Sequence, residues 1–308
     1  MKAEAIKEAV RQTYGAIAAG QTQETGGGCC GSGASCCGST PSSSLGLGYS
    51  EDDLGAVPEG ADLGLGCGNP QAIAALRPGE RVLDLGSGAG FDAFLAARQV
   101  GPDGHVLGVD MTAAMVAKAR GNAAKAGLAN VEFRLGEIEH LPVTDASVDV
   151  IMSNCVINLS PDKAAVFAEA FRVLAPGGRL AISDIVALAP LPESLAADVA
   201  AYTGCIAGAA VVTDLWQMLT AAGFANVRID IKAGSRALVS GWLPGRGAED
   251  YVASASIEAI KPSPACCDST LLSTCCPSEA KAECCGEPAA TATATGSAKA
   301  PATCGCGH

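Results

Sequence analysis

Short apolar runs alternate with helical patterns from residue 81 to residue 260, and this alternation restricts the folds that the chain can adopt. Seven runs have the length and the branched apolar residues of strands: 81–85, 105–110, 131–135, 147–153, 179–185, 227–231 and 251–260. Helical periodicity separates several of them, at 91–100, 113–126, 163–174 and 214–222. This order predicts an α/β fold with a doubly wound parallel sheet and helices on both faces. Ligands of such sheets bind at the carboxyl ends of the strands.

Composition divides the chain of 308 residues into three zones. Residues 1–44 begin with a helical pattern and continue as a segment rich in Gly, Ser and Cys. Residues 45–262 look globular. Residues 263–308 are rich in Ala, Thr, Ser, Pro and Cys and have no sustained periodicity. We therefore expect a globular middle zone and a disordered, Cys-rich tail.

The charge balance limits the partners that the chain can have. A net charge of −12 argues against nucleic acid and against an anionic membrane, because both need clustered Lys and Arg. The first twenty residues are interspersed with charges, and no run approaches the ~18 apolar residues of a membrane helix. We expect a soluble, cytoplasmic protein that acts as a monomer.

Fifteen cysteines are an unusual number for such a chain. Ten of them form adjacent pairs: Cys29–Cys30, Cys36–Cys37, Cys266–Cys267, Cys275–Cys276 and Cys284–Cys285. Neighbouring Cα atoms are ~3.8 Å apart, closer than the ~4.4–6.8 Å of a relaxed disulfide. The pairs are better suited to chelating a soft, thiophilic ion. An unselected low-complexity terminus is the plainer explanation of the pairs in the tail.

A glycine-rich turn follows the first strand-like run. In LDLGSGAGFD, Gly86, Gly88 and Gly90 form a G-x-G-x-G pattern between a strand and a helix, where backbone can approach a ligand closely. Asp110 ends the second run and is placed to accept both hydroxyls of a ribose. A glycine triad alone is weak evidence, but the triad with Asp110 and the later GEIEHLP sequence indicates a nucleotide-containing cofactor.

With Asp84 just before it, this turn resembles motif I of the seven-stranded, Rossmann-like class I methyltransferases that use S-adenosylmethionine. The spacing departs from the G-x-G-x-x-G pattern of a nicotinamide dinucleotide site, which is the alternative. The resemblance implies that the methionine part of S-adenosylmethionine lies near Asp84, Gly86 and Gly88, the ribose near Asp110, Met111 and Thr112, the adenine near Gly136, Ile138 and Glu139, and the sulfonium near Asn154. Tyr49 and Ser87 complete the expected cofactor-binding set.

The globular zone holds three cysteines, Cys67, Cys155 and Cys205. A buried cysteine is often only a small apolar residue, a reading that suits Cys205, whereas the glycines around Cys67 favour a loop. Cys155 follows the fourth run, where a methyl group would be presented. His105 and His140 are not placed to act as a base there, although an Asp or Glu could serve. Trivalent arsenic needs none, because three soft thiolates can hold it while its lone pair stays exposed.

Several stretches resemble the arsenite S-adenosylmethionine methyltransferases: LGLGCGNP, GVDMT, SNCVINLSPDK, FRVLAPGGRLAISDIV and YTGCIAGA, within Tyr49 to Pro262. The resemblance implies that Cys155 and Cys205 bind As(III) and that Cys67 is a third arsenic-linked or redox thiol. It also implies a cysteine of the N-terminal segment, one of Cys29, Cys30, Cys36 and Cys37. Residues 45–186 would form the cofactor domain, and residues 187–262 would complete the sheet and a small arsenic-site subdomain.

The implied substrates are arsenite and methylarsenite as thiol conjugates, with glutathione or thioredoxin as the reductant. Two other functions remain open at this stage. A methyltransferase acting on another small molecule keeps the cofactor loop but leaves the three cysteines unexplained. A soft-metal buffer or sensor explains the paired cysteines but leaves the glycine turn and Asp110 unexplained.

Overall fold

The computed structural model describes residues 3–21, 44–196, 198–242 and 245–263. The architecture below is that of the unit Met1–Pro262. The four cysteines between residues 29 and 37 and all cysteines of the predicted tail lie outside the described residues. Their expected roles therefore stay predictions.

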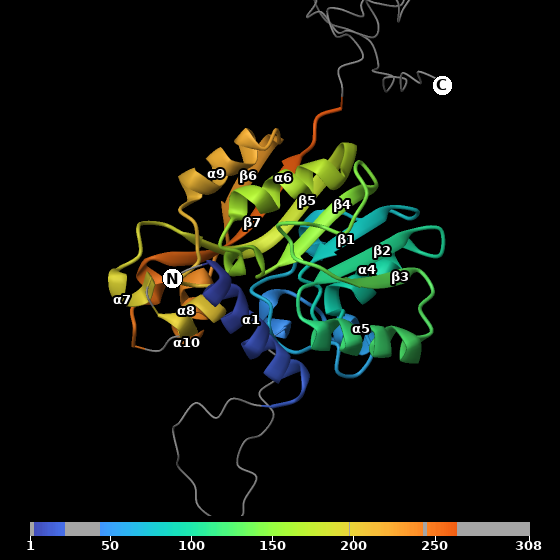
Figure 1. Ribbon diagram of the computed structural model, residues 1–308, viewed down its shortest axis with the longest axis horizontal. Helices are drawn as coiled ribbons and strands as arrows, with labels where there is room; N and C mark the ends of the chain where they lie inside the picture. Colours follow the sequence, from blue (N-terminus) through green and yellow to red (C-terminus); the bar gives the residue numbers. More distant parts are fainter. Residues whose placement is uncertain (1–2, 22–43, 197, 243–244, 264–308) are drawn as a thin grey trace, which may run out of the picture. The chain divides into compact units, whose positions relative to one another are not determined.

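The described residues form a seven-stranded sheet in the order β3-β2-β1-β4-β5-β7-β6 (Figure 1). The strands are β1 (Arg81–Leu85), β2 (His105–Asp110), β3 (Val131–Leu135), β4 (Val148–Asn154), β5 (Leu174–Ala187), β6 (Ala225–Ile231) and β7 (Val252–Ile260). Neighbours from β3 to β5 pair in parallel. The predicted doubly wound, seven-stranded fold is confirmed.

One strand runs against the predicted direction. β7 pairs antiparallel with both β5 and β6, with Ile231 opposite Ala255. Among the described residues, the segment between β6 and β7 holds only two short elements, the helix α10 (Ser235–Trp242) and the 3₁₀ turn Ala248–Asp250. The chain therefore re-enters the sheet from the end at which it left, because a parallel return needs a crossover along the sheet. β5 also begins at Leu174, five residues before the predicted start, and its pairing with β4 is irregular between Val148 and Val150.

The other helices are α1 (Ala3–Ala18), α2 (Glu51–Ala56), α3 (Gln71–Ala74), α4 (Phe91–Val100), α5 (Ala113–Ala126), α6 (Lys163–Val173), α7 (Glu193–Ala196), α8 (Val199–Thr203) and α9 (Val212–Ala221). Short 3₁₀ turns cover Leu45–Leu47, Ile157–Leu159 and Ala248–Asp250. None of the helices in the described ranges is long and apolar enough to cross a membrane.

Two apolar clusters, one on each face of the sheet, form the core. Val82 of β1 packs with α4 and α5, whereas its neighbours Leu83 and Leu85 belong to the cluster with α6 and α9. This alternation follows from the two-residue period of a strand, which sends successive side chains to opposite faces. A third cluster contains Cys67, Cys155 and Cys205.

Helix α1 lies beside segments that are distant in sequence. It contacts α5, α8 and the 3₁₀ turn that follows β4, and it is the blue helix between α8 and α5 in Figure 1. Ile6 and Val10 are buried on its inner face, as the helical spacing of its apolar residues indicates. The N-terminal helix therefore reaches the carboxyl end of β4, where the predicted site lies.

Candidate active site

The glycine-rich turn connects β1 to α4. Gly86, Gly88 and Gly90 have φ values of +68°, +51° and +98°, a region that other residues avoid. Close approach is a second requirement, since a Cβ at Gly86 would collide with Val156 and one at Gly90 would lie 2.7 Å from the Phe94 ring. At Gly86 and Gly90 the turn thus needs glycine for both conformation and space, whereas Gly88 is required for its conformation alone.

Asp110 fixes this turn to the end of β2. Its carboxylate accepts hydrogen bonds from the backbone N–H of Gly88 at 3.0 Å and of Thr112 at 2.8 Å. Burial raises the pKa of Asp110, and these two hydrogen bonds oppose the rise. Each carboxylate oxygen keeps a further lone pair, so the residue can still accept ribose hydroxyls.

Two cavities meet at this end of the sheet. The first cavity is lined by Gly86, Asp110, Met111, Thr112, Ile138, Glu139, Asn154, Cys155 and others, including Lys7, Val10 and Tyr14 of α1. The second cavity is lined by Tyr49, Asp62, Asp84, Gly86, Ser87, Asp92, Asn154 and others. Gly88 and Gly136 are the members of the predicted cofactor set that line neither of these two cavities.

The second cavity offers unused polar atoms. Asp84 Oδ2 and Ser87 Oγ are buried and have no hydrogen-bond partner among the described residues. Burial, followed by the nearby carboxylates of Asp92 and Asp110, raises the pKa of Asp84 well above its ordinary value. Orphaned buried polar atoms cost free energy unless a ligand satisfies them. Acceptors of this kind fit the amino group and other donors of an amino-acid-containing cofactor such as S-adenosylmethionine.

Asp92 is a site residue that the sequence analysis missed. It lies in the first turn of α4, is 8% exposed, and accepts hydrogen bonds from the Tyr49 hydroxyl at 2.6 Å and from Asn154 Nδ2 at 3.1 Å. An acid among the apolar residues FDAFLAA was the available signal. The carboxylate holds a tyrosine and an asparagine at the border of the two cavities.

The three cysteines of the globular zone converge. Cys67 lies in the loop between α2 and α3, Cys155 follows β4, and Cys205 follows α8. Cys67 and Cys155 form a disulfide with a Cα–Cα distance of 5.6 Å. Cys205 is a free, buried thiol whose Sγ donates to the carbonyl oxygen of Cys155 at 2.7 Å. The structure therefore differs from the expected trio of free thiolates, because two of the three are joined.

Both Cys155 and Cys205 have left-handed backbone conformations, with φ values of +57° and +64°. For a residue with a Cβ this conformation costs about 1–2 kcal/mol. Backbone hydrogen bonds help to hold it, from Cys155 N to Ser183 O at 2.9 Å and from Cys205 N to Tyr202 O at 2.9 Å. Such strain gathers at functional sites, where the surrounding structure compensates for it.

A third cavity adjoins the cysteines. Its lining includes Cys155, Cys205, Leu65, Tyr14 and Trp242. Cys155, Leu65 and Tyr14 also line the first cavity. The cavity at the thiol cluster and the cavity at the predicted nucleotide site thus share lining side chains.

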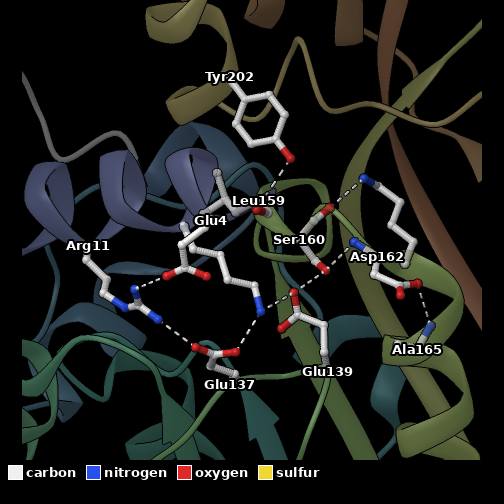
Figure 2. A network of polar contacts seen from close by, with 11 residues as sticks. Glu4, Arg11, Glu137, Glu139, Leu159, Ser160, Asp162, Ala165 and Tyr202 are labelled. Atoms are coloured by element: carbon white, nitrogen blue, oxygen red, sulfur yellow. Dashed lines mark hydrogen bonds and ion pairs between the residues drawn. The ribbon is translucent and has the colours of Figure 1, made fainter. Parts of the chain in front are cut away.

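Charged residues attach α1 to the first cavity (Figure 2). Lys7 Nζ lies 2.6 Å from Glu137 and 3.4 Å from Glu139, and Arg11 lies 2.6 Å from Glu137. Ser160 donates to Glu139 at 2.7 Å. Glu139 was assigned to the adenine from the sequence, but its ion pair with Lys7 was not anticipated, because Lys7 lies far from it along the chain.

Two further titratable groups lie near the cysteines, the buried Asp184 and the half-buried Lys163. Burial raises the pKa of Asp184 to about 6, although backbone donors and Lys163 favour its ionised form. Burial lowers the pKa of Lys163, although the nearby Asp184 and Cys205 act to raise it. A carboxylate oxygen of Asp184 lies within 4.8 Å of the sulfurs of Cys67 and Cys155.

Comparison with known proteins agrees with this geometry. A family model described as a methyltransferase domain matches residues 76–223. The arsenite methyltransferase of Halobacterium salinarum is 54% identical over 268 residues, which are 84% of this chain and 67% of that protein. The chain belongs to the arsenite methyltransferase family.

Other members of the arsenite methyltransferase family are also similar. The arsenite methyltransferase of Aquipseudomonas alcaligenes is 39% identical over 231 residues, 73% of this chain and 63% of that protein. The crystal structure of CrArsM, an arsenic(III) S-adenosylmethionine methyltransferase from Chlamydomonas reinhardtii, matches with a TM-score of 0.53 and 34% identity, covering 72% of this chain and 74% of that one. The predicted family and the class I methyltransferase fold are confirmed.

Proposed function

We propose that the chain methylates trivalent arsenic, in arsenite and in methylarsenite, with S-adenosylmethionine as the methyl donor, and thereby detoxifies arsenic. The observation that carries the proposal is the meeting of Cys67, Cys155 and Cys205 beside the first cavity. The activities named for the similar proteins support it.

S-adenosylmethionine supplies an electrophilic methyl group on a sulfonium. Asp84 and Ser87 offer it unused acceptors, and Asp110 offers acceptor positions to the ribose. Asn154 lines both cavities and would lie near the reacting end. These roles follow the assignment made from sequence, and positioning would supply much of the rate.

The chain's thiols would hold the substrate. Burial raises the pKa of the Cys205 thiol well above its ordinary value, so the free residue is a neutral thiol. Each As–S bond to the protein forms as a bound thiolate leaves with that proton, for example as glutathione. The substrate's lone pair would then form the new As–C bond as the methyl–sulfonium C–S bond breaks and S-adenosylhomocysteine leaves. This transfer formally oxidises arsenic by two electrons.

Two protein thiolates would return these electrons and become a disulfide. Cys67 and Cys155 are the pair joined in this structure, which supports this assignment. Glutathione or thioredoxin would then restore the two thiols by exchange. No histidine is needed as a base. The two histidines of the globular zone are both exposed, His105 at the start of β2 and His140 directly after Glu139. A cytoplasmic monomer remains part of the proposal.

The test is product formation. The full chain is incubated with methyl-labelled S-adenosylmethionine, arsenite and glutathione, and methylated arsenicals are separated and counted. Cys155→Ser and Cys205→Ser are each expected to abolish methylation while binding S-adenosylmethionine within twofold of the parent. Methylation of arsenite by both variants would overturn the thiolate mechanism, and cofactor consumption only with another acceptor would indicate a different methyltransferase.

The paired cysteines outside the described residues enter the proposal as a capture device for As(III). Deletion of residues 263–308 is then expected to slow methylation at low arsenite and to change little at saturation. Equal rates at every arsenite concentration would favour an unselected tail.

A further inference from the structure

Two asparagines flank Cys155 in the stretch SNCVIN, and each contacts the loop of one of the other two cysteines. We propose that Asn154 and Asn158 are positioning residues that assemble the three-cysteine site: Asn154 fixes Cys67, and Asn158 fixes Cys205, relative to Cys155. The arsenic-binding part of this inference rests on the proposed function. The part that concerns the disulfide does not.

Asn154 forms two hydrogen bonds with the Cys67 loop. Its Oδ1 accepts a hydrogen bond from Cys67 N at 3.1 Å, and its Nδ2 donates to Gly68 O at 2.8 Å. A Cβ on Gly66 would lie 2.8 Å from Asn154 Nδ2, so the loop can come this close only with glycine at that position. One carboxamide thus replaces the backbone pairing that a strand would otherwise provide.

The Asn154 side chain is itself held in one orientation. Its Nδ2 also lies 3.1 Å from the Tyr49 hydroxyl and 3.1 Å from Asp92 Oδ2, and Tyr49 donates to Asp92 at 2.6 Å. All of these acceptors surround the amide nitrogen, which turns Oδ1 toward the Cys67 amide. The buried carboxylate of Asp92 therefore acts on Cys67 through Asn154.

Asn158 contacts the Cys205 loop in the same way. Its Nδ2 lies 3.3 Å from Cys205 O, 2.6 Å from Ile185 O and 2.9 Å from Asp184 Oδ1, and the residue is 3% exposed. A Cβ on Gly208 would collide with the Asn158 carbonyl oxygen. Both cysteine loops therefore use a glycine to approach an asparagine of the same short stretch.

The arrangement explains how distant cysteines keep a fixed spacing. Cys67 and Cys155 are 88 positions apart, and Cys155 and Cys205 both have strained left-handed backbones. Neither the loop of Cys67 nor that of Cys205 is a strand paired with β4. A purely structural role for buried asparagines is the competing explanation. A structural role predicts that replacing either asparagine disturbs Cys67 and Cys205 equally. The proposal predicts that replacing Asn154 disturbs Cys67 and that replacing Asn158 disturbs Cys205.

The first measurement needs neither arsenic nor cofactor. The full chain is equilibrated in glutathione buffers, in which the Cys67–Cys155 disulfide and two glutathiones exchange with two protein thiols and one glutathione disulfide. The linked and free peptides are quantified by mass spectrometry. Asn154→Ala removes two hydrogen bonds to the Cys67 loop and is expected to lower the equilibrium constant for the protein disulfide about tenfold.

The matched control is Asn130→Ala. Asn130 Nδ2 donates to Ala97 O and Gly101 O, each at 2.8 Å, and the residue contacts no cysteine loop through these bonds. Asn130→Ala and Asn158→Ala are both expected to leave the disulfide equilibrium within twofold of the parent. An Asn154→Ala equilibrium within twofold of the parent, or an equal shift in all three variants, would overturn the role of Asn154.

The second measurement follows Cys205. Methylarsenite has two exchangeable positions, so it can bridge Cys155 and Cys205 in the reduced chain and protect Cys205 from alkylation by iodoacetamide. Asn158→Ala is expected to raise the methylarsenite concentration for half-protection about fivefold, with Asn154→Ala and Asn130→Ala within twofold of the parent. No change in Asn158→Ala would refute its role.

The two measurements separate this inference from the proposed function. If methylarsenite does not protect Cys205 even in the parent chain, the arsenic site is wrong and the role given to Asn158 falls with it. The disulfide equilibrium still decides whether Asn154 positions Cys67.

Discussion

The Cys205 thiol donates a hydrogen bond to the carbonyl oxygen of Cys155, 2.7 Å away. The two residues come from different parts of the chain, one after β4 and one after α8, and both have left-handed backbones. A thiol is a weak donor, but a buried carbonyl oxygen that loses its partner still carries a desolvation cost. The contact therefore holds the free thiol in the site before substrate arrives.

This contact predicts different stabilities for two replacements of Cys205. In Cys205→Ser the hydroxyl can still donate to Cys155 O, whereas in Cys205→Ala the oxygen loses this donor. We expect Cys205→Ala to unfold with a free energy about 1 kcal/mol below that of Cys205→Ser, in urea titrations under identical conditions. Neither variant should methylate arsenite. Equal stability of the two variants would show that the hydrogen bond contributes nothing.

Gly90 gives a prediction with a close control. Its φ is +98°, and an added Cβ would lie 2.7 Å from Phe94 and 2.9 Å from Phe133, two buried rings. Gly127 has a similar left-handed φ of +63° but open space around it. Gly127→Ala should therefore lose only about 1 kcal/mol, while Gly90→Ala should lose roughly 2–5 kcal/mol because overpacking is added. Urea unfolding measures both, and equal losses would mean that the rings can move aside.

The strands and the main helices were predictable because their signal is local. The bounds of α4 and α5 agree with the predicted ranges, since both end at the glycine that follows their apolar pattern: Gly101 and Gly127. The direction of β7 was not predictable from its own residues. Direction depends on where the preceding connection lies, and periodicity carries no information about that.

The site was predictable only in part. The grouping of Cys67, Cys155 and Cys205 came from the resemblance to a family, because nothing local relates residues 88 positions apart. Asp92 and Asn158 were missed, although each is a polar residue inside an apolar stretch. Their roles depend on partners such as Tyr49 and Cys205, which are brought near only by the fold.

Asp184 predicts a pH dependence of stability. Burial raises its pKa to about 6 in the folded chain, against about 3.9 in an unfolded one, so the folded state binds the proton more tightly between these values. The stability that this group contributes is therefore full below about pH 4 and is lost as pH rises through about 6. The titratable groups that interact electrostatically with it include Lys163, Cys205 and Tyr14.

Asp184→Asn removes this titration. The difference in unfolding free energy, parent minus variant, should fall as pH rises from 4.5 to 6.5, by up to about 1.4 kcal/mol per pH unit. The other carboxyl groups with raised pKa values, Asp84, Asp92 and Asp110, contribute equally to both chains, so their effect on the pH dependence cancels in the difference. A difference that is constant or that rises with pH would contradict the assignment.

Tyr14 links α1 to the loop of Cys205. Its hydroxyl donates to Thr203 O at 3.1 Å, and its ring lines both the first and the third cavity. Tyr14→Phe keeps the ring but loses the hydrogen bond, worth about 1 kcal/mol, so the segment that covers Cys205 should open more often. We expect alkylation of Cys205 by iodoacetamide to become about fivefold faster, measured on the Cys205 peptide.

Tyr202→Phe is the control for this experiment. Its hydroxyl also reaches a backbone oxygen near the site, that of Leu159, but at 3.5 Å, where a hydrogen bond is weak (Figure 2). Its removal should change the alkylation rate of Cys205 by less than twofold. Equal acceleration in both variants would mean that Cys205 is exposed by loosening of the whole site, and the specific contact between α1 and its loop would not be the cause.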